Sequence, residues 1–127
     1  MKKILIVEDE FIIAEDIKVT VKEFGYEVIK ILPSSNEVIK FLESSYEKPD
    51  LILLDIKIEG AMNGVELAKY IKDKYNIPMI FCTAYHGQEI DNLYNELGIK
   101  VVKKPYLDYV LKEAIDTTFK IKNTLPS

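Results

Sequence analysis

The sequence predicts an α/β fold in which five parallel strands form a doubly wound sheet with helices on both faces. Two observations predict it. Five short apolar runs alternate with five amphipathic stretches along the 127 residues. The runs are aliphatic with almost no polar alternation, which is typical of strands buried on both faces. Strict alternation of strand and helix favours a parallel sheet with right-handed crossovers, and the length suits one domain.

The five apolar runs are the expected strands. They lie at Ile4–Val7, Val28–Leu32, Leu51–Leu54, Met79–Cys82 and Val101–Val102. Ligands of doubly wound sheets bind beyond the carboxyl ends of the strands, near the point where the strand order reverses. The residues that directly follow each run are therefore the first candidates for function.

The stretches between the first three runs predict two helices. Apolar side chains recur at helical spacing from Phe11 to Phe24, and Gly25 is the expected C-cap. Ser34 or Ser35 can cap the second helix, because a hydroxyl oxygen can accept a hydrogen bond from a free N–H of the first turn.

Three further helices are expected in the second half of the chain. Asn63 followed by Glu66 resembles a capping box at the start of the third. The fourth is expected over 87–97 and ends before Gly98, and Asp108 is expected to cap the fifth. We expect one domain over residues 1–122 and a frayed C-terminal tail over residues 123–127.

Composition argues against several classes of protein. The net charge is −4 and the lysines are spread along the chain, which argues against direct binding of nucleic acid. No stretch approaches the roughly 18 apolar residues of a membrane span, and the N-terminal apolar run is too short for a signal peptide. The single cysteine, Cys82, lies in an apolar run and indicates an inert buried thiol in a reducing, cytoplasmic compartment.

Candidate functional side chains follow four of the five expected strands. Glu8 and Asp9 follow the first strand, Asp55 the third, Thr83 and Ala84 the fourth, and Lys104 the fifth. Each alone has an ordinary explanation as a turn former, a helix cap or a solvated lysine. Their coincidence at one edge of the sheet favours a pocket that gathers three carboxylates, a hydroxyl and an ammonium.

Three carboxylates in one pocket require positive charge. Two carboxylates about 4 Å apart repel by roughly 4 kcal/mol at an effective dielectric constant of about 20. Lys104 supplies one positive charge, and a hard divalent cation such as Mg²⁺, which prefers carboxylate, water and phosphate oxygens, would supply the rest. A zinc site is not expected, because His86 is the only histidine and no His/Cys cluster is present.

Five short motifs occur in order along the chain. They are Ile4-Leu5-Ile6-Val7-Glu8-Asp9-Glu10, Leu53-Leu54-Asp55-Ile56, Asn63-Gly64-Val65-Glu66-Leu67-Ala68, Thr83-Ala84 and Lys104-Pro105-Tyr106. Together they resemble the receiver domain of two-component response regulators, of the CheY-like type, over nearly the whole chain. The resemblance implies the flavodoxin-like strand order 2-1-3-4-5.

The resemblance implies a metal site. Asp55 matches the phosphoacceptor, which also contacts Mg²⁺ (or Mn²⁺). Asp9 would hold the ion directly and Glu8 through water, and the backbone carbonyl of Lys57 matches the remaining protein ligand. The metal would neutralise the negative charge that gathers around the transferred phosphoryl group.

The resemblance also implies the groups that bind the phosphoryl oxygens. Lys104 matches the cation that pairs with the phosphoryl group, and Thr83 matches the hydroxyl that turns toward it. Ala84 is small, so its backbone N–H can approach a phosphate oxygen without obstruction. Pro105 matches a proline that is often preceded by a cis peptide bond.

The resemblance implies partners as well. The phosphoryl donor would be a sensor histidine kinase or phosphotransfer protein, and the switched surface would bind an unknown downstream protein target. Such a switch catalyses only its own phosphotransfer and dephosphorylation and is not a metabolic enzyme. We expect a monomer or weak homodimer without direct nucleic-acid or membrane contact. Tyr94, Lys100 and Lys103 mark a candidate partner surface, or simply a solvated face. No output domain is expected, so the chain acts alone or comes from a longer protein.

The chain departs from the family pattern in two places. Val101 lies where the family often has an aromatic residue that reports activation, and Tyr85 or Tyr106 could replace it. The loop after the third strand lacks a common proline and is one residue longer. Lys57 and Tyr85 flank the phosphoryl group by family position. We hypothesise that both restrict water and prolong phosphorylation, the alternative being that both point to solvent.

Three other interpretations compete with this one. A flavodoxin-type cofactor binder would need a phosphate-binding loop after the first strand, where Glu8 and Asp9 would repel a phosphate. A phosphatase with an aspartyl nucleophile would need a second acid two residues after Asp55, where this chain has Lys57. A phosphorylation-independent receiver-like interaction scaffold is the strongest alternative. Such a scaffold would be expected to lack one of the acids or the lysine, and none is missing.

Overall fold

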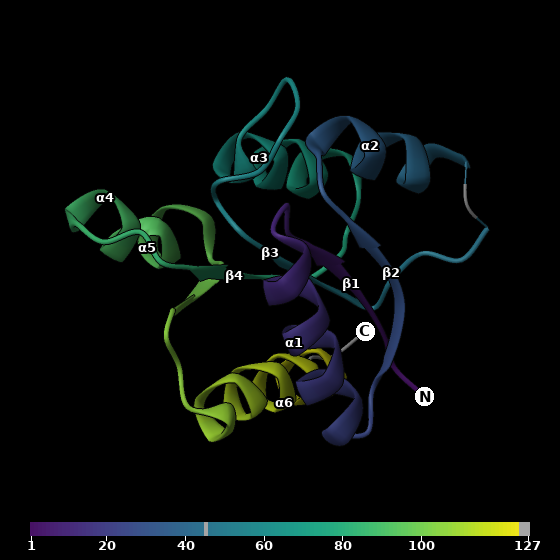
Figure 1. Ribbon diagram of the computed structural model, residues 1–127, viewed down its shortest axis with the longest axis vertical. Coiled ribbons are helices and arrows are strands. Elements are labelled where there is room, and N and C mark those ends of the chain that lie inside the picture. Colours follow the sequence, from purple (N-terminus) through teal and green to yellow (C-terminus); the bar gives the residue numbers. More distant parts are fainter. Residues whose placement is uncertain (45, 125–127) are drawn as a thin grey trace.

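The computed structural model describes residues 1–44 and 46–124 and has the predicted α/β fold (Figure 1). Its strands are β1 (Lys3–Val7), β2 (Glu27–Leu32), β3 (Leu51–Leu54), β4 (Met79–Thr83) and β5 (Lys100–Lys103). All pair in parallel, in the order β2-β1-β3-β4-β5. The predicted strand order is confirmed, and each strand lies within one residue of its expected bounds.

The helices form layers on both faces of the sheet. They are α1 (Phe11–Glu23), α2 (Ser35–Ser44), α3 (Gly64–Lys74), α4 (Gln88–Asp91), α5 (Leu93–Leu97) and α6 (Asp108–Thr124). Figure 1 shows α1 and α6 together on one face, with α2 and α3 on the other. Within the described part of the chain, no helix is long and apolar enough to cross a membrane.

The core has two halves, because successive side chains of a strand point to opposite faces. In β1, Leu5 and Val7 pack toward α2 and α3, whereas Ile4 and Ile6 pack toward α1 and α6. The central strands β1, β3 and β4 are almost fully buried, but the edge strand β2 is half-exposed. The expectation that all five strands are buried on both faces is therefore wrong for the edge strands β2 and β5, each of which has one strand neighbour.

Most predicted helix ends are confirmed. Glu66 N–H donates to Asn63 Oδ1 at 2.9 Å and Asn63 N–H donates to Glu66 Oε1 at 3.0 Å, which is the expected capping box. Ser34, the residue before α2, accepts from Glu37 N–H at 3.2 Å and is thus the cap. The predicted cap at Gly25 is one residue late: α1 ends at Glu23, Phe24 is its C-cap, and Gly25, with φ of 97°, follows Phe24.

Three helix predictions need correction. The expected helix over 87–97 is split into α4 and α5; no side chain of α4 is fully buried, and Ile90 packs only partly on the core. Asp108 is the first residue of α6, not its cap: Val110 N–H and Leu111 N–H both donate to the Leu107 carbonyl. The helix continues through Thr124, two residues past the expected domain end, and residues 125–127 of the expected tail lie outside the described residues.

Candidate phosphoacceptor site

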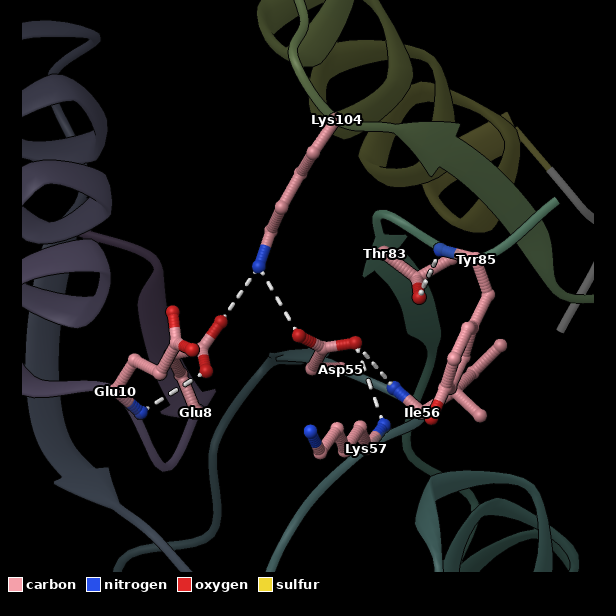
Figure 2. Close-up of polar contacts among 8 residues, drawn as sticks. All are labelled: Glu8, Glu10, Asp55, Ile56, Lys57, Thr83, Tyr85 and Lys104. Atoms are coloured by element: carbon pink, nitrogen blue, oxygen red, sulfur yellow. Dashed lines mark hydrogen bonds and ion pairs between the residues drawn. The ribbon is translucent and has the colours of Figure 1, made fainter.

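Three predicted side chains meet beyond the carboxyl ends of β1, β3 and β5. Lys104 Nζ lies 2.5 Å from Glu8 Oε1 and 3.1 Å from Asp55 Oδ2. Figure 2 shows the lysine side chain reaching down between the two carboxylates, which come from separate strands. The strand order brings the ends of β1 and β3 side by side, so the gathering of these residues follows from the topology.

Asp55 is held through both of its carboxylate oxygens. Oδ1 accepts from the backbone N–H groups of Ile56, at 2.7 Å, and Lys57, at 3.4 Å, while Oδ2 accepts from Lys104. The Asp55 side chain is 13% exposed, so it is oriented by the protein yet open to a small reactant. This combination suits a nucleophile whose attacking oxygen must be placed before the reaction.

Gly64, the first residue of α3, lies against the backbone of Asp55 and Ile56. Gly64 N–H donates to the Ile56 carbonyl at 2.7 Å. A Cβ at Gly64 would lie 2.1 Å from the Asp55 carbonyl oxygen and 2.6 Å from the Ile56 Cα. Such distances are far inside van der Waals contact, so only glycine allows α3 to start directly against the backbone of Asp55.

Glu8 and Lys104 form a buried ion pair, and Asp55 contacts the same ammonium group. The Glu8 side chain is 2% exposed and the Lys104 side chain 14%. Burial raises the pKa of Glu8, and hydrogen bonds from Lys104 and the Glu10 N–H partly oppose that shift. For Lys104, burial acts to lower the pKa, but the Glu8 hydrogen bond and the charges of Glu8 and Asp55 outweigh burial and raise it. The lysine therefore stays protonated, as a fixed positive charge beside Asp55.

Thr83 and Ala84 lie at the end of β4, on the far side of Asp55. Thr83 is buried, and its Oγ1 accepts from the Tyr85 N–H at 3.1 Å (Figure 2). The hydroxyl is thus engaged with its own loop in this conformation, whereas Ala84 is exposed. Both residues come to the predicted edge of the sheet, but no hydrogen bond joins Thr83 to Asp55 among the described residues.

The expected group of three carboxylates is only partly formed. Across residues 1–44 and 46–124, no three His, Cys, Asp or Glu side chains gather as a metal site would require. Glu8 and Asp55 share the Lys104 ammonium, whose single positive charge balances only one of the two carboxylates. The predicted convergence of three acids is therefore not formed in the described part of the chain in this conformation, and the metal-binding role of Asp9 stays a prediction.

The donor chemistry nevertheless suits a hard divalent cation. The position between Glu8 and Asp55 already accommodates a positive group, as the two short ammonium contacts demonstrate. Asp9 follows Glu8 directly, and the Lys57 carbonyl belongs to the backbone that donates to Asp55. All four groups are oxygen donors, which Mg²⁺ prefers to nitrogen or sulfur.

Other family-based expectations have mixed outcomes. The Lys104–Pro105 peptide bond is cis, as predicted. Val101 is half-buried in β5 and Tyr106 packs on the core beside α1 and α6, whereas Tyr85 is 46% exposed. Lys57 is exposed as well. Tyr85 is therefore the more accessible candidate for the role that the family gives to an aromatic residue at the Val101 position.

Sequence reasoning missed the groups that support the site from outside. Glu10 N–H donates to Glu8 Oε2 at 3.1 Å, which orients the buried acid. Ser35 and Asn36, at the start of α2, accept hydrogen bonds from the loop that follows Asp55. A glycine at position 60 was the only signal in the sequence that another backbone or side chain comes close there.

A parallel sheet in this order, with a lysine bridging two strand-end acids, defines the signal receiver class of protein. The family model described as "Response regulator receiver domain" matches residues 4–116. The chain belongs to this family. It is a signalling domain of response regulators.

Relatives agree with this assignment. The chain is 35% identical over 83 residues to the phyllosphere-induced regulator PhyR of Methylorubrum extorquens, a match that covers 65% of this chain and 31% of PhyR. The matched region thus spans about a third of that curated relative. PhyR is therefore much longer than the region it shares with this chain.

Solved structures give the same architecture. The signal receiver domain of a modulated diguanylate cyclase from Desulfovibrio desulfuricans is similar with a TM-score of 0.85 and 26% identity, and 97% of each chain is covered. The response regulatory domain of protein MrkE from Klebsiella pneumoniae has a TM-score of 0.84 and 26% identity, covering 97% of this chain and 99% of its own.

Proposed function

We propose that Asp55 accepts a phosphoryl group from the phosphohistidine of a sensor histidine kinase or phosphotransfer protein, in a Mg²⁺-dependent reaction in the cytoplasm. The observation that carries the proposal is the bridge from Lys104 Nζ to Asp55 Oδ2 and Glu8 Oε1. It places a fixed positive charge beside a partly exposed carboxylate. That arrangement suits attack on phosphorus better than it suits a purely structural ion pair, which would bury both partners.

The chain's own residues can carry out each part of the transfer. An Asp55 oxygen attacks phosphorus in line, the O–P bond forms, and the P–N bond of the donor breaks with the imidazole as leaving group. Lys104 then pairs with a phosphoryl oxygen, and the Ile56 and Lys57 N–H groups hold the other carboxylate oxygen in place. Water later attacks the acyl phosphate and releases inorganic phosphate and the free carboxylate.

The carboxylates of Asp9 and Asp55 and the Lys57 carbonyl would hold Mg²⁺ directly, and Glu8 would hold it through water. Bound there, the ion would neutralise charge on the phosphoryl oxygens. Manganese, with the same preference for oxygen, would replace it. Since binding occurs only to the folded acidic site, Mg²⁺ should raise the Tm.

Phosphorylation would act as a switch through the end of β4. Thr83 Oγ1 now accepts from the Tyr85 N–H, and a phosphoryl oxygen on Asp55 would offer the Thr83 O–H an acceptor of its own, while the Ala84 N–H is free of a bulky side chain. Movement of this loop would change a surface that binds a downstream protein target. The chain would act as a monomer or weak homodimer and turn over no metabolite.

A direct test is incubation with acetyl phosphate, with and without Mg²⁺, followed by intact mass spectrometry. We expect the mass of one phosphoryl group to appear only with Mg²⁺, and only while Asp55 is present. Asp55→Asn is the test variant, and Asp73→Asn, at an exposed position of α3, is the matched control. An unmodified wild-type protein under these conditions would instead support the phosphorylation-independent scaffold.

We also propose that Lys57 and Tyr85 limit the access of water to phosphorylated Asp55. Both are exposed, and Lys57 N–H donates to Asp55 Oδ1. In Figure 2 the two residues lie on either side of the Asp55 carboxylate. Lys57→Ala and Tyr85→Ala should each speed dephosphorylation about fivefold, measured by loss of the phosphorylated mass. Unchanged rates would mean that both side chains point to solvent and do not limit the access of water.

A further inference from the structure

The loop between β3 and α3 carries the nucleophile at its start and the proposed metal-binding carbonyl of Lys57. Its two ends meet where Gly64 N–H donates to the Ile56 carbonyl at 2.7 Å. Loops whose ends meet in this way are normally packed by their own side chains. Here Ile58 and Met62 pack partly on the core, but the middle of the loop at Gly60 and Ala61 is exposed and is held by contacts from another segment.

The start of α2 supplies that support. Ala61 N–H donates to Asn36 Oδ1 at 2.9 Å, and Met62 N–H donates to Ser35 Oγ at 3.0 Å. Two residues before Ala61, Glu59 pairs with Ser34 in a parallel bridge. These contacts join segments more than twenty residues apart in sequence and cover the loop from Glu59 to Met62.

The geometry at Gly60 indicates how closely the two segments fit. A Cβ there would lie 2.5 Å from both Asn36 Oδ1 and Ser35 Oγ, and 3.0 Å from Ser35 N. Gly60 also has a φ of 107°, a conformation that favours glycine. Because Gly60 has no side chain, Asn36 Oδ1 and Ser35 Oγ can occupy that space.

Helix capping does not explain Ser35 and Asn36. Ser34 Oγ already accepts from the Glu37 N–H and donates to Glu37 Oε2 at 2.9 Å, so the start of α2 has its cap. The oxygens of Ser35 and Asn36 point instead to the neighbouring loop. Ser35 is 1% exposed, and its buried hydroxyl oxygen accepts from the loop amide of Met62.

We propose that Asn36 and Ser35 are positioning residues of the phosphoacceptor site, which hold the β3–α3 loop so that the Lys57 carbonyl is available to Mg²⁺. This inference rests on the proposed function. Asp55 itself is held by Lys104 and by the Ile56 N–H at 2.7 Å, and neither contact involves α2 or the segment that α2 holds. Loss of the α2 contacts should therefore weaken metal binding more than it slows the transfer step.

The test compares Asn36→Ala and Ser35→Ala with wild-type protein in two measurements. The first is a Mg²⁺ titration of the unphosphorylated protein, followed by NMR shifts of the backbone amides. The second is the initial rate of phosphorylation by acetyl phosphate as a function of Mg²⁺. We expect each variant to raise the half-saturating Mg²⁺ concentration about fivefold in both measurements, as loss of one hydrogen bond would. The maximum rate at saturating Mg²⁺ should change less than about twofold.

Two further variants separate positioning from general stability. Asn36→Asp keeps the acceptor oxygen and should bind Mg²⁺ at least as tightly as the wild type. Asn95→Ala, at an exposed position of α5, should match the wild type in both measurements. Wild-type half-saturation in Asn36→Ala and Ser35→Ala would overturn the positioning role alone. A wild-type protein that acetyl phosphate does not modify would overturn the proposed function and this inference together.

Discussion

The two sides of the phosphoacceptor site differ in how firmly they are held. On the β3 side, the loop from Asp55 to Asn63 is tied to α2, closed by Gly64 and capped at the start of α3. On the β4 side, the segment after Thr83 forms two short helices, of which α4 buries no side chain. A cleft of about 910 Å³ separates this segment from the start of α3.

The difference teaches which half of the site can change shape. A region with many buried contacts opens only with much of the fold, whereas a weakly packed region opens locally at low cost in free energy. The firmly held β3 side contains Asp55 and Lys57, whose positions matter for the proposed phosphoryl transfer. The weakly packed segment begins directly after the buried Thr83, whose hydroxyl accepts from the Tyr85 N–H of that segment, so a new charge at Asp55 could draw the two into a second arrangement.

The largest expected effect comes from replacing one glycine by alanine on each side of the site. Gly64→Ala would place a Cβ 2.1 Å from the Asp55 carbonyl oxygen, and we expect the free energy of unfolding to fall by about 4 kcal/mol. Gly87→Ala, whose Cβ meets nothing within 4 Å, should cost about 1 kcal/mol through its positive φ alone. Urea denaturation measures both. Equal losses would abolish the distinction between the two sides.

The next effect concerns the charge that links the two acids. Lys104→Met leaves the buried Glu8 carboxylate unpaired and should lower the free energy of unfolding by about 3 kcal/mol. Lys103→Met removes only an exposed pair with Asp91 and should cost less than about 1 kcal/mol. Adding Glu8→Gln to Lys104→Met should restore most of the loss. A double variant as unstable as Lys104→Met would show that the lysine stabilises through packing.

The same lysine predicts a dependence on alkaline pH. Its folded pKa lies above the usual 10.5, so its contribution to stability is complete below pH 10.5 and disappears as the pH rises through the folded pKa. The Tm difference between wild type and Lys104→Met, measured in metal-free buffer, should therefore be constant near neutrality and shrink at high pH. A difference that stays constant throughout would contradict the shift.

The smallest effect tests the weakly held side itself. Thr83→Val removes the acceptor of the Tyr85 N–H and should lower stability by about 1 kcal/mol, with faster hydrogen exchange at the Tyr85 amide. Thr118→Val removes a hydroxyl that donates to the Ala114 carbonyl at 2.8 Å within α6, and should leave exchange at Tyr85 unchanged. Unaltered exchange in Thr83→Val would mean that other contacts hold this loop.

Sequence patterns predicted the sheet well because burial determines it. The continuous aliphatic runs at Ile4–Val7 and Leu51–Leu54 could only be central strands, and the structure has them there, fully buried. Once the strands were assigned, Glu8 and Asp55 followed as neighbours from topology, and Lys104 followed at the same edge of the sheet. The Asn63–Glu66 capping box was predictable as well, because it depends only on residues three apart.

What could not be predicted depends on contacts between distant segments. No local pattern indicates that Ser35 and Asn36 would accept from Met62 and Ala61, since their chemistry is equally suited to helix capping. The break between α4 and α5 was missed because periodicity over 87–97 carries no information on whether a partner surface exists. The direct pairing of Lys104 with Glu8 also depends on side-chain reach, which strand order does not specify.

The position of Lys104 in the sequence determines when the site is completed during synthesis of the chain. Glu8 and Asp55 are made early on the ribosome, but their shared counter-ion is encoded nearly fifty residues after Asp55 and arrives with the last strand of the sheet. A nascent or proteolytically clipped chain without β5 therefore has two uncompensated acids where the nucleophile should be. On the proposed function, only a chain that has completed its sheet could therefore accept the phosphoryl group.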